Sequence, residues 1–150
     1  MNHATKLIYS LILLSFCFVS SANECALTVA STDMMQYDSQ SLSVKKSCSS
    51  FSLELIHKGN LAKNVMGHNV VIVPTDAFNK VIAMINMSEG IENGFLPDAH
   101  EILAKTAMIG GGEQTKVDIN LESFEIGKAY TFFCSFPGHY AIMKGKLEIL

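Results

Sequence analysis

The chain has 150 residues, of which 49% are apolar and 17% charged, and its formal net charge is −3. This composition excludes a disordered tail, and the length fits one domain. All 11 basic residues are lysines, so the sequence lacks both the positive charge and the arginines typical of a nucleic-acid-binding protein. Beyond the N-terminus, no stretch approaches the roughly 20 apolar residues of a membrane span.

The N-terminus has the pattern of a secretory signal peptide. Lys6 precedes an apolar run, 7–19, that only two serines interrupt, and the small residues Ser20 to Ala22 follow it. This pattern predicts that residues 1–22 are removed on export and that the mature protein is one periplasmic domain, residues 23–150. An uncleaved membrane anchor is the alternative. A domain of 128 residues buries roughly two-thirds of its unfolded surface and needs no cross-link to fold.

Three cysteines remain in the mature chain: Cys25, Cys48 and Cys134. A disulfide between Cys25 and Cys48 would close a loop of about two dozen residues and contribute about 3 kcal/mol in the chain-entropy model. Cys134 is then left over, and an odd cysteine in an exported protein needs an explanation. It is either a small buried apolar side chain or a functional thiol.

Short segments of alternating or continuous apolar residues predict an all-β domain. Ser50–His57 and Lys116–Leu121 alternate between apolar and polar residues, as half-buried strands do. A short helix is expected from Thr75, as its cap, to about Ile85, with apolar residues on one face. Many short strands with one helical excursion favour an antiparallel sandwich or barrel. The other expected strands are 69–73, 101–109, 128–134 and 144–150.

The last quarter of the chain presents a thiol, an imidazole and a thioether on one loop. Cys134, His139 and Met143 lie between the last two expected strands, and His68 opens an earlier strand that can reach the same end of a sandwich. Two imidazoles, one thiolate and a weak thioether form the ligand set of a blue-copper electron-transfer site. This set leaves no position for a substrate, which favours a carrier over an enzyme.

Each of these residues also has an ordinary structural interpretation. Met143 alone would more often fill a core, and His139 alone would more often be a surface or hydrogen-bonded imidazole. The combination at this spacing, in an exported β-rich chain with an odd thiol, favours the metal site.

The site motifs resemble those of the azurins. The spacing Cys-x₄-His-x₃-Met distinguishes azurins from plastocyanins, and the segments Asn64–Asn69 and Phe132–His139 are similar to the two azurin site segments almost letter for letter. The mature length, the spacing of Cys25 and Cys48 and the glycine turn 109–113 also fit. The resemblance therefore covers residues 23–150.

This resemblance implies a Greek-key cupredoxin sandwich of about eight strands, with the helix as a flap outside it and one disulfide. It also implies one type 1 copper ion with His68, Cys134 and His139 as equatorial ligands. Met143 and the carbonyl oxygen of Gly67 would be the axial ligands. The backbone N–H groups of Asn69 and Phe136 would point at the Cys134 sulfur and thereby shift the reduction potential.

The resemblance further implies a monomeric carrier that docks transiently with redox proteins, such as a cytochrome, dehydrogenase or reductase, near His139. On sequence alone, the residues expected to line this docking patch could equally be core. His57 is either a titrating neighbour of the site or a satisfied structural imidazole, and His100 is expected in an exposed loop. The patch residues are Leu61, Val65, Met66, Phe136, Ala141 and Ile142.

Two positions depart from many azurins. Val70 stands where a buried tryptophan is often found, and the chain has no tryptophan. Lys105 stands where some azurins have a histidine. The first change is expected to alter core packing and fluorescence without loss of copper binding, and the second removes a surface redox-labelling site.

Other functional classes explain less of the sequence. A thiol hydrolase would use Cys134 and His139 but would leave Met143 unexplained and has no evident third group. A multicopper oxidase or nitrite reductase domain would need more histidines and a longer chain. Periplasmic copper storage or delivery uses the same ligands and is the alternative function. It predicts labile, exposed ligands, whereas a carrier predicts a closed and rigid site.

Overall fold

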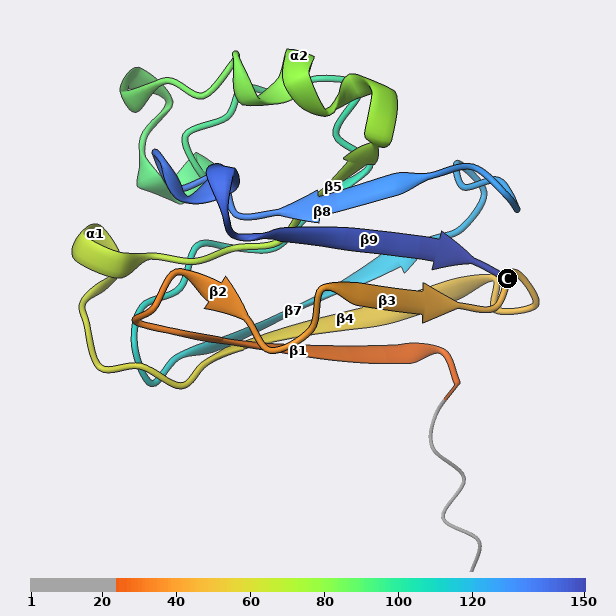
Figure 1. Cartoon of the computed structure of the whole chain (residues 1–150), viewed down its shortest axis with the longest axis horizontal. Coiled ribbons are helices and arrows are strands. Elements are labelled where there is room, and N and C mark those ends of the chain that lie inside the picture. Colours follow the sequence, from red (N-terminus) through yellow and green to blue (C-terminus); the bar gives the residue numbers. More distant parts are fainter. Residues whose placement is uncertain (1–23) are drawn as a thin grey trace, which may run out of the picture.

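The computed structural model describes residues 24–150, which form a sandwich of two β-sheets (Figure 1). The expected signal peptide, residues 1–22, lies outside the described residues. Within residues 24–150, no helix is long and apolar enough to cross a membrane. The strands are β1 (Ala26–Thr32), β2 (Gln36–Tyr37), β3 (Ser41–Val44), β4 (Ser50–His57), β5 (Val71–Pro74), β6 (Ala104–Lys105), β7 (Gln114–Asn120), β8 (Tyr130–Phe133) and β9 (Lys144–Ile149).

The helical segments are all short. They are α1 (Lys63–Met66), α2 (Phe78–Ile82) and four 3₁₀ turns, η1 (Thr75–Ala77), η2 (Met87–Glu89), η3 (Ile91–Asn93) and η4 (His139–Ala141).

One sheet has the strand order β2-β1-β4-β7 and the other β3-β9-β8-β5-β6. Most neighbouring strands are antiparallel, but β1 pairs with β4 and β3 pairs with β9 in parallel. The expectation of an antiparallel sandwich is therefore incomplete. Between β1 and β4 the chain crosses to the other sheet, where it forms β3, and it then returns, so β1 and β4 run in the same direction side by side.

The two sheets enclose one main hydrophobic core. Alternate residues of β4 (Phe51, Leu53 and Leu55) are almost completely buried, which confirms the alternation in the sequence. β8 is buried along its whole length because its outer face is covered as well. Val70, at the position where many azurins have tryptophan, is a fully buried member of this core.

The helical flap lies outside the sheet that contains β5 and β8 (Figure 1). Phe78, Ile82 and Ile85 pack there against a second apolar cluster that includes Val73 and Phe133, so the expected apolar face is confirmed. The expected cap is wrong. Thr75 lies inside η1, and its hydroxyl bonds with that of Thr131 at 3.0 Å.

Two further expectations need correction. The segment 101–109 forms a ladder only at β6, although the backbone N–H groups of Leu103 and Thr106 still donate to carbonyls of Ile72 and Val70. It therefore runs beside β5 without regular pairing. The helix α1 was not expected, because its four residues are too few to show a helical pattern of apolar residues.

A disulfide joins Cys25 and Cys48, with their Cα atoms 5.7 Å apart. It ties the start of β1 to the chain just before β4. The two cysteines are 23 residues apart in sequence, so the bond constrains a sizeable loop of the unfolded chain. Cys134 is a buried free thiol.

We expect the double substitution Cys25→Ala/Cys48→Ala to lower the free energy of unfolding of the copper-free protein by about 3 kcal/mol, because it releases this loop in the unfolded state. Denaturant titration followed by circular dichroism measures the change. The reduced wild-type protein retains both sulfur atoms and serves as the control for lost packing. An unchanged midpoint in both samples would contradict the prediction.

Candidate metal centre

Three buried side chains place their donor atoms together at one end of the sandwich. His68, Cys134 and His139 bring ring nitrogens and a thiol sulfur within 4.8 Å of one another. The Cys134 Sγ atom lies 3.8 Å from His68 Nδ1 and 3.7 Å from His139 Nδ1. The exposed fractions of the three residues are 0%, 0% and 5%, so this cluster is closed to bulk solvent.

The spacing of these atoms fits a metal ion bound between them. Metal–nitrogen bonds of about 2.0 Å and metal–sulfur bonds of about 2.3 Å that diverge by about 120° separate nitrogen from sulfur by about 3.7 Å. The two nitrogen–sulfur distances match this value. A set of one thiolate and two imidazoles in a trigonal arrangement suits copper.

Hydrogen bonding prepares His68 as a ligand. Its Nε2 atom lies 2.9 Å from the carbonyl oxygen of Thr32. A carbonyl only accepts, so Nε2 carries the proton, and Nδ1 presents its lone pair to the site. Burial lowers the pKa of His68 to about 4, which keeps the ring neutral at neutral pH. Burial also lowers the pKa of His139.

The protonation state of the Cys134 thiol depends on whether the site holds a cation. Burial raises the pKa of its thiol to about 12, although hydrogen bonds from the backbone N–H groups of Asn69 and Phe136 act in the opposite direction. The free thiol is therefore protonated at neutral pH, and a bound cation is needed to stabilise the thiolate here.

The loop between β8 and β9 presents Cys134 and His139 from a compact turn. Gly138 has a φ of +86°, a conformation that favours glycine, and η4 begins at His139 directly after it. The chain then closes on itself, because Met143 N–H donates to His139 O and Cys134 N–H donates to Met143 O. Met143 is fully buried in the same core as Cys134.

Gly67 places its carbonyl oxygen 3.8 Å from the Cys134 sulfur. A Cβ atom at this position would lie 2.4 Å from the backbone oxygen of Lys63 and 3.0 Å from the Met108 side chain. The close approach of α1 therefore requires glycine here.

The two segments that carry His68 and Cys134 are joined by a buried hydrogen-bond cluster that sequence reasoning missed. The Asn69 side chain accepts from Ser135 N–H at 2.9 Å and donates to Ser135 Oγ at 2.9 Å. Ser135 Oγ in turn donates to the carbonyl oxygen of Gly94 at 2.6 Å. The cluster ties the segment before β5, the loop after β8 and the turn after η3 together. A serine directly after the cysteine gave no signal of this role.

Aromatic rings hold His139 in place. The Phe136 ring lies with its centroid 4.5 Å from that of His139, and Phe95 contacts Phe136 edge to face at 5.6 Å. Phe95 has a φ of +59°, which is unusual for a phenylalanine.

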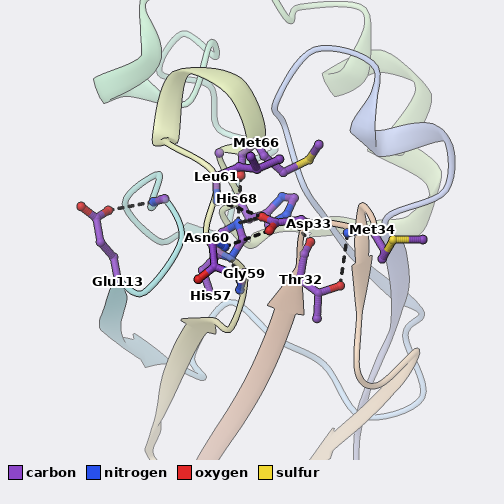
Figure 2. A network of polar contacts seen from close by, with 12 residues as sticks. Thr32, Asp33, Met34, His57, Gly59, Asn60, Leu61, Met66, His68 and Glu113 are labelled. Atoms are coloured by element: carbon purple, nitrogen blue, oxygen red, sulfur yellow. Dashed lines mark hydrogen bonds and ion pairs between the residues drawn. The ribbon is translucent and has the colours of Figure 1, made fainter.

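Figure 2 shows His57 beneath His68, where the two rings stack with centroids 4.5 Å apart. His57 Nδ1 accepts from Gly59 N–H at 3.0 Å, and Nε2 lies 2.9 Å from the Met66 carbonyl oxygen. Both ring nitrogens therefore have hydrogen-bond partners when Nε2 carries the proton. The Asp33 carboxylate also lies near this ring, with Oδ1 3.8 Å from Nε2. His100, in contrast, is 88% exposed in a loop, as expected.

The expected patch residues lie at the surface. The exposed fractions of Leu61, Val65 and Ile142 are 41%, 56% and 60%, and Ala141 is also exposed, whereas Met66 and Phe136 are half-buried. Met34, on the turn between β1 and β2, is 70% exposed and was not expected from the sequence. Lys105 lies on β6 and donates to the carbonyl oxygen of Asn93 at 3.3 Å.

Comparisons with known proteins identify the family of this chain. A family model described as copper binding proteins, plastocyanin/azurin family, matches residues 23–150. Azurin of Pseudomonas putida is 42% identical over 127 residues, which are 84% of this chain and 98% of that protein. Azurin of Bordetella pertussis is 42% identical over 130 residues, 86% of each chain.

A solved structure of the azurin Az-iso2 from the obligate methylotroph Methylomonas sp. strain J has a TM-score of 0.79 and 38% identity. The match covers 84% of this chain and 98% of that one. The chain therefore belongs to the plastocyanin/azurin family of copper-binding proteins. Its cofactor is copper.

We expect Ser135→Ala to lower the free energy of unfolding of the copper-free protein by about 2 kcal/mol, because the Asn69 amide and the Gly94 carbonyl lose a buried partner. Thermal or denaturant unfolding measures the loss. Ser31→Ala is the matched control. Ser31 is also fully buried, but its Oγ has no hydrogen-bond partner among residues 24–150. This control should be neutral or stabilising, and equal losses in the two variants would contradict the prediction.

Proposed function

We propose that this chain is a periplasmic blue-copper electron carrier, exported with cleavage after Ala22 and active as a monomer. In this proposal His68, Cys134 and His139 would hold the copper ion through their clustered donor atoms. The Met143 thioether and the Gly67 carbonyl oxygen would serve as weaker ligands. When bound, copper supplies the one-electron couple between Cu(II) and Cu(I).

The observation that carries the proposal is the position of the two imidazole nitrogens and the thiol sulfur. They are buried, held in place by the fold, and spaced as ligands of one metal ion would be. The His68 ring is fixed by Thr32 and by the His57 ring, and Cys134 is fixed by two backbone N–H groups. Because these side chains need not move when one electron arrives or leaves, transfer is fast. A storage or delivery protein would need ligands that open to release the metal, and the buried donors argue against that alternative.

The route for electrons in this proposal is the edge of His139. This residue keeps a small exposed fraction, 5%, and is neighboured in sequence by the exposed residues Ala141 and Ile142. Apolar side chains around a nearly buried ligand suit brief docking with a redox protein, because small interfaces release quickly. The donor and acceptor proteins are expected to be other redox proteins of the periplasm.

Visible absorption of the copper-loaded mature protein tests the site. We expect an intense thiolate-to-copper band that bleaches on reduction and returns on reoxidation, and we expect Cys134→Ser to lose this band. Circular dichroism of the variant verifies that its fold is intact. Binding of Cu(II) without colour in the wild-type protein would exclude Cys134 as a ligand and favour storage or zinc binding.

A charged residue on the patch should slow electron exchange without altering the metal site. Ile142→Glu places like charges face to face when two copies meet, so we expect a lower rate of electron self-exchange and a steeper dependence on salt. Ile126→Glu is the matched control. Ile126 is 67% exposed. It precedes the first residue of β8, whereas Cys134 follows the last, so the two residues belong to opposite ends of this strand. Equal rates for the two variants would show that exchange does not proceed through the patch.

A further inference from the structure

We propose that Tyr37 is a positioning residue of the copper site, because its hydroxyl fixes the backbone of Asn69, whose N–H donates to the Cys134 sulfur. This inference rests on the proposed function and deepens it. Tyr37 lies in the two-residue strand β2, and no sequence motif indicates a role for it.

Tyr37 reaches from one sheet to the other. β2 pairs only with β1, at the edge of the first sheet, while Asn69 lies two residues before the second sheet's strand β5. The Tyr37 hydroxyl donates to the backbone carbonyl oxygen of Asn69 at 2.5 Å, and this hydrogen bond is buried. The ring packs against Phe132, with centroids 5.4 Å apart. Tyr37 is 7% exposed, so bulk water does not compete readily for the hydrogen bond between its hydroxyl and the Asn69 carbonyl.

The hydrogen bond completes a clamp around Asn69. The peptide that follows Asn69 has its carbonyl bonded by Tyr37 and its N–H, that of Val70, bonded to Thr106 Oγ1 at 2.9 Å. The Asn69 side chain is bonded to Ser135. With the following peptide and the side chain both fixed, the remaining backbone N–H of Asn69 is directed at the Cys134 sulfur.

The role of Tyr37 requires a hydroxyl that keeps its proton. Burial raises the pKa of Tyr37 well above its ordinary value, and the nearby Cys134 acts in the same direction. The hydroxyl therefore keeps its proton at neutral pH and donates it to the Asn69 carbonyl oxygen. A phenylalanine would fill the same space but would leave the Asn69 carbonyl without this donor.

The consequence for the metal site has a definite sign. Hydrogen bonds to the sulfur stabilise negative charge on the thiolate, and the reduced site carries one more negative charge than the oxidised site. When the clamp is loosened, the N–H group of Asn69 is held less firmly at the sulfur, and the reduced state loses more stabilisation than the oxidised state. The reduction potential should therefore fall.

The test compares Tyr37→Phe with Tyr130→Phe. Tyr130 is also buried, and its hydroxyl also makes one backbone hydrogen bond, accepting from Glu125 N–H at 2.7 Å. That bond lies at the end of β8 opposite Cys134. Both variants lose a buried hydroxyl, so general destabilisation is matched and only the location differs.

Two measurements are made on each protein. Amide hydrogen exchange of the copper-free protein is read at Asn69 and Val70 relative to Leu53 in the central strand β4. The reduction potential and the thiolate-to-copper band are read on the copper-loaded protein. In Tyr37→Phe we expect relative exchange at Asn69 and Val70 to be faster by about tenfold, the factor for losing one buried hydrogen bond. We also expect a lower potential and a shifted band, and no such changes in Tyr130→Phe.

Unchanged relative exchange and an unchanged potential in Tyr37→Phe would overturn the inference, as would equal changes in both variants. Thr106→Val releases the same peptide from its other side and should change both readings in the same direction. It provides the test if Tyr37→Phe does not fold. If the wild-type protein forms no coloured site, the proposed function fails, whereas the exchange measurement on the copper-free protein still tests the clamp.

Discussion

The structure depends on the hydrogen bonds between the Asn69 side chain and Ser135, which join the two segments that carry His68 and Cys134. His68 precedes β5 and Cys134 follows β8, and these strands are antiparallel neighbours in one sheet. The pairing alone brings the two segments to the same end of the sandwich. The amide of Asn69 then fixes their separation, because a polar group with no exposure must satisfy its hydrogen bonds within the protein.

The part of the site within one loop could be predicted from the sequence, and the part that spans the fold could not. The spacing of Cys134, His139 and Met143 follows directly from chain order. The pairing of His68 with them needed either a sandwich topology or a resemblance to a family, because 66 residues separate it from Cys134. Ser135 and Tyr37 were missed for a different reason. Each acts through a backbone or amide group on a distant segment, and common residues such as these carry no motif.

The elements of the fold also divide into those that local sequence patterns predicted and those that they did not. The long alternating strand β4 and the buried strand β8 were predicted because their apolar residues repeat over several positions. The strands β1 and β3 pair in parallel with distant strands, and β2 has two residues, so local patterns gave little signal. In the segment 101–109 apolar content predicted a continuous strand, but its backbone donors meet β5 at irregular intervals, and only β6 forms a ladder.

The closed site explains why burial and metal binding support each other. Cys134 lies in an apolar core that opposes ionisation of its thiol. The two N–H groups at its sulfur favour the thiolate, but without a cation they are not enough to form it at neutral pH. A copper ion held by Cys134 would compensate for the cost of the charge, and the same N–H groups would then influence how that charge is shared between sulfur and metal. The rigid surroundings of His68, with Thr32 at Nε2 and His57 on its face, leave its ring one useful orientation. Because the fold already holds these donor side chains in place without the metal, they would need to move little when a bound copper ion gains or loses an electron.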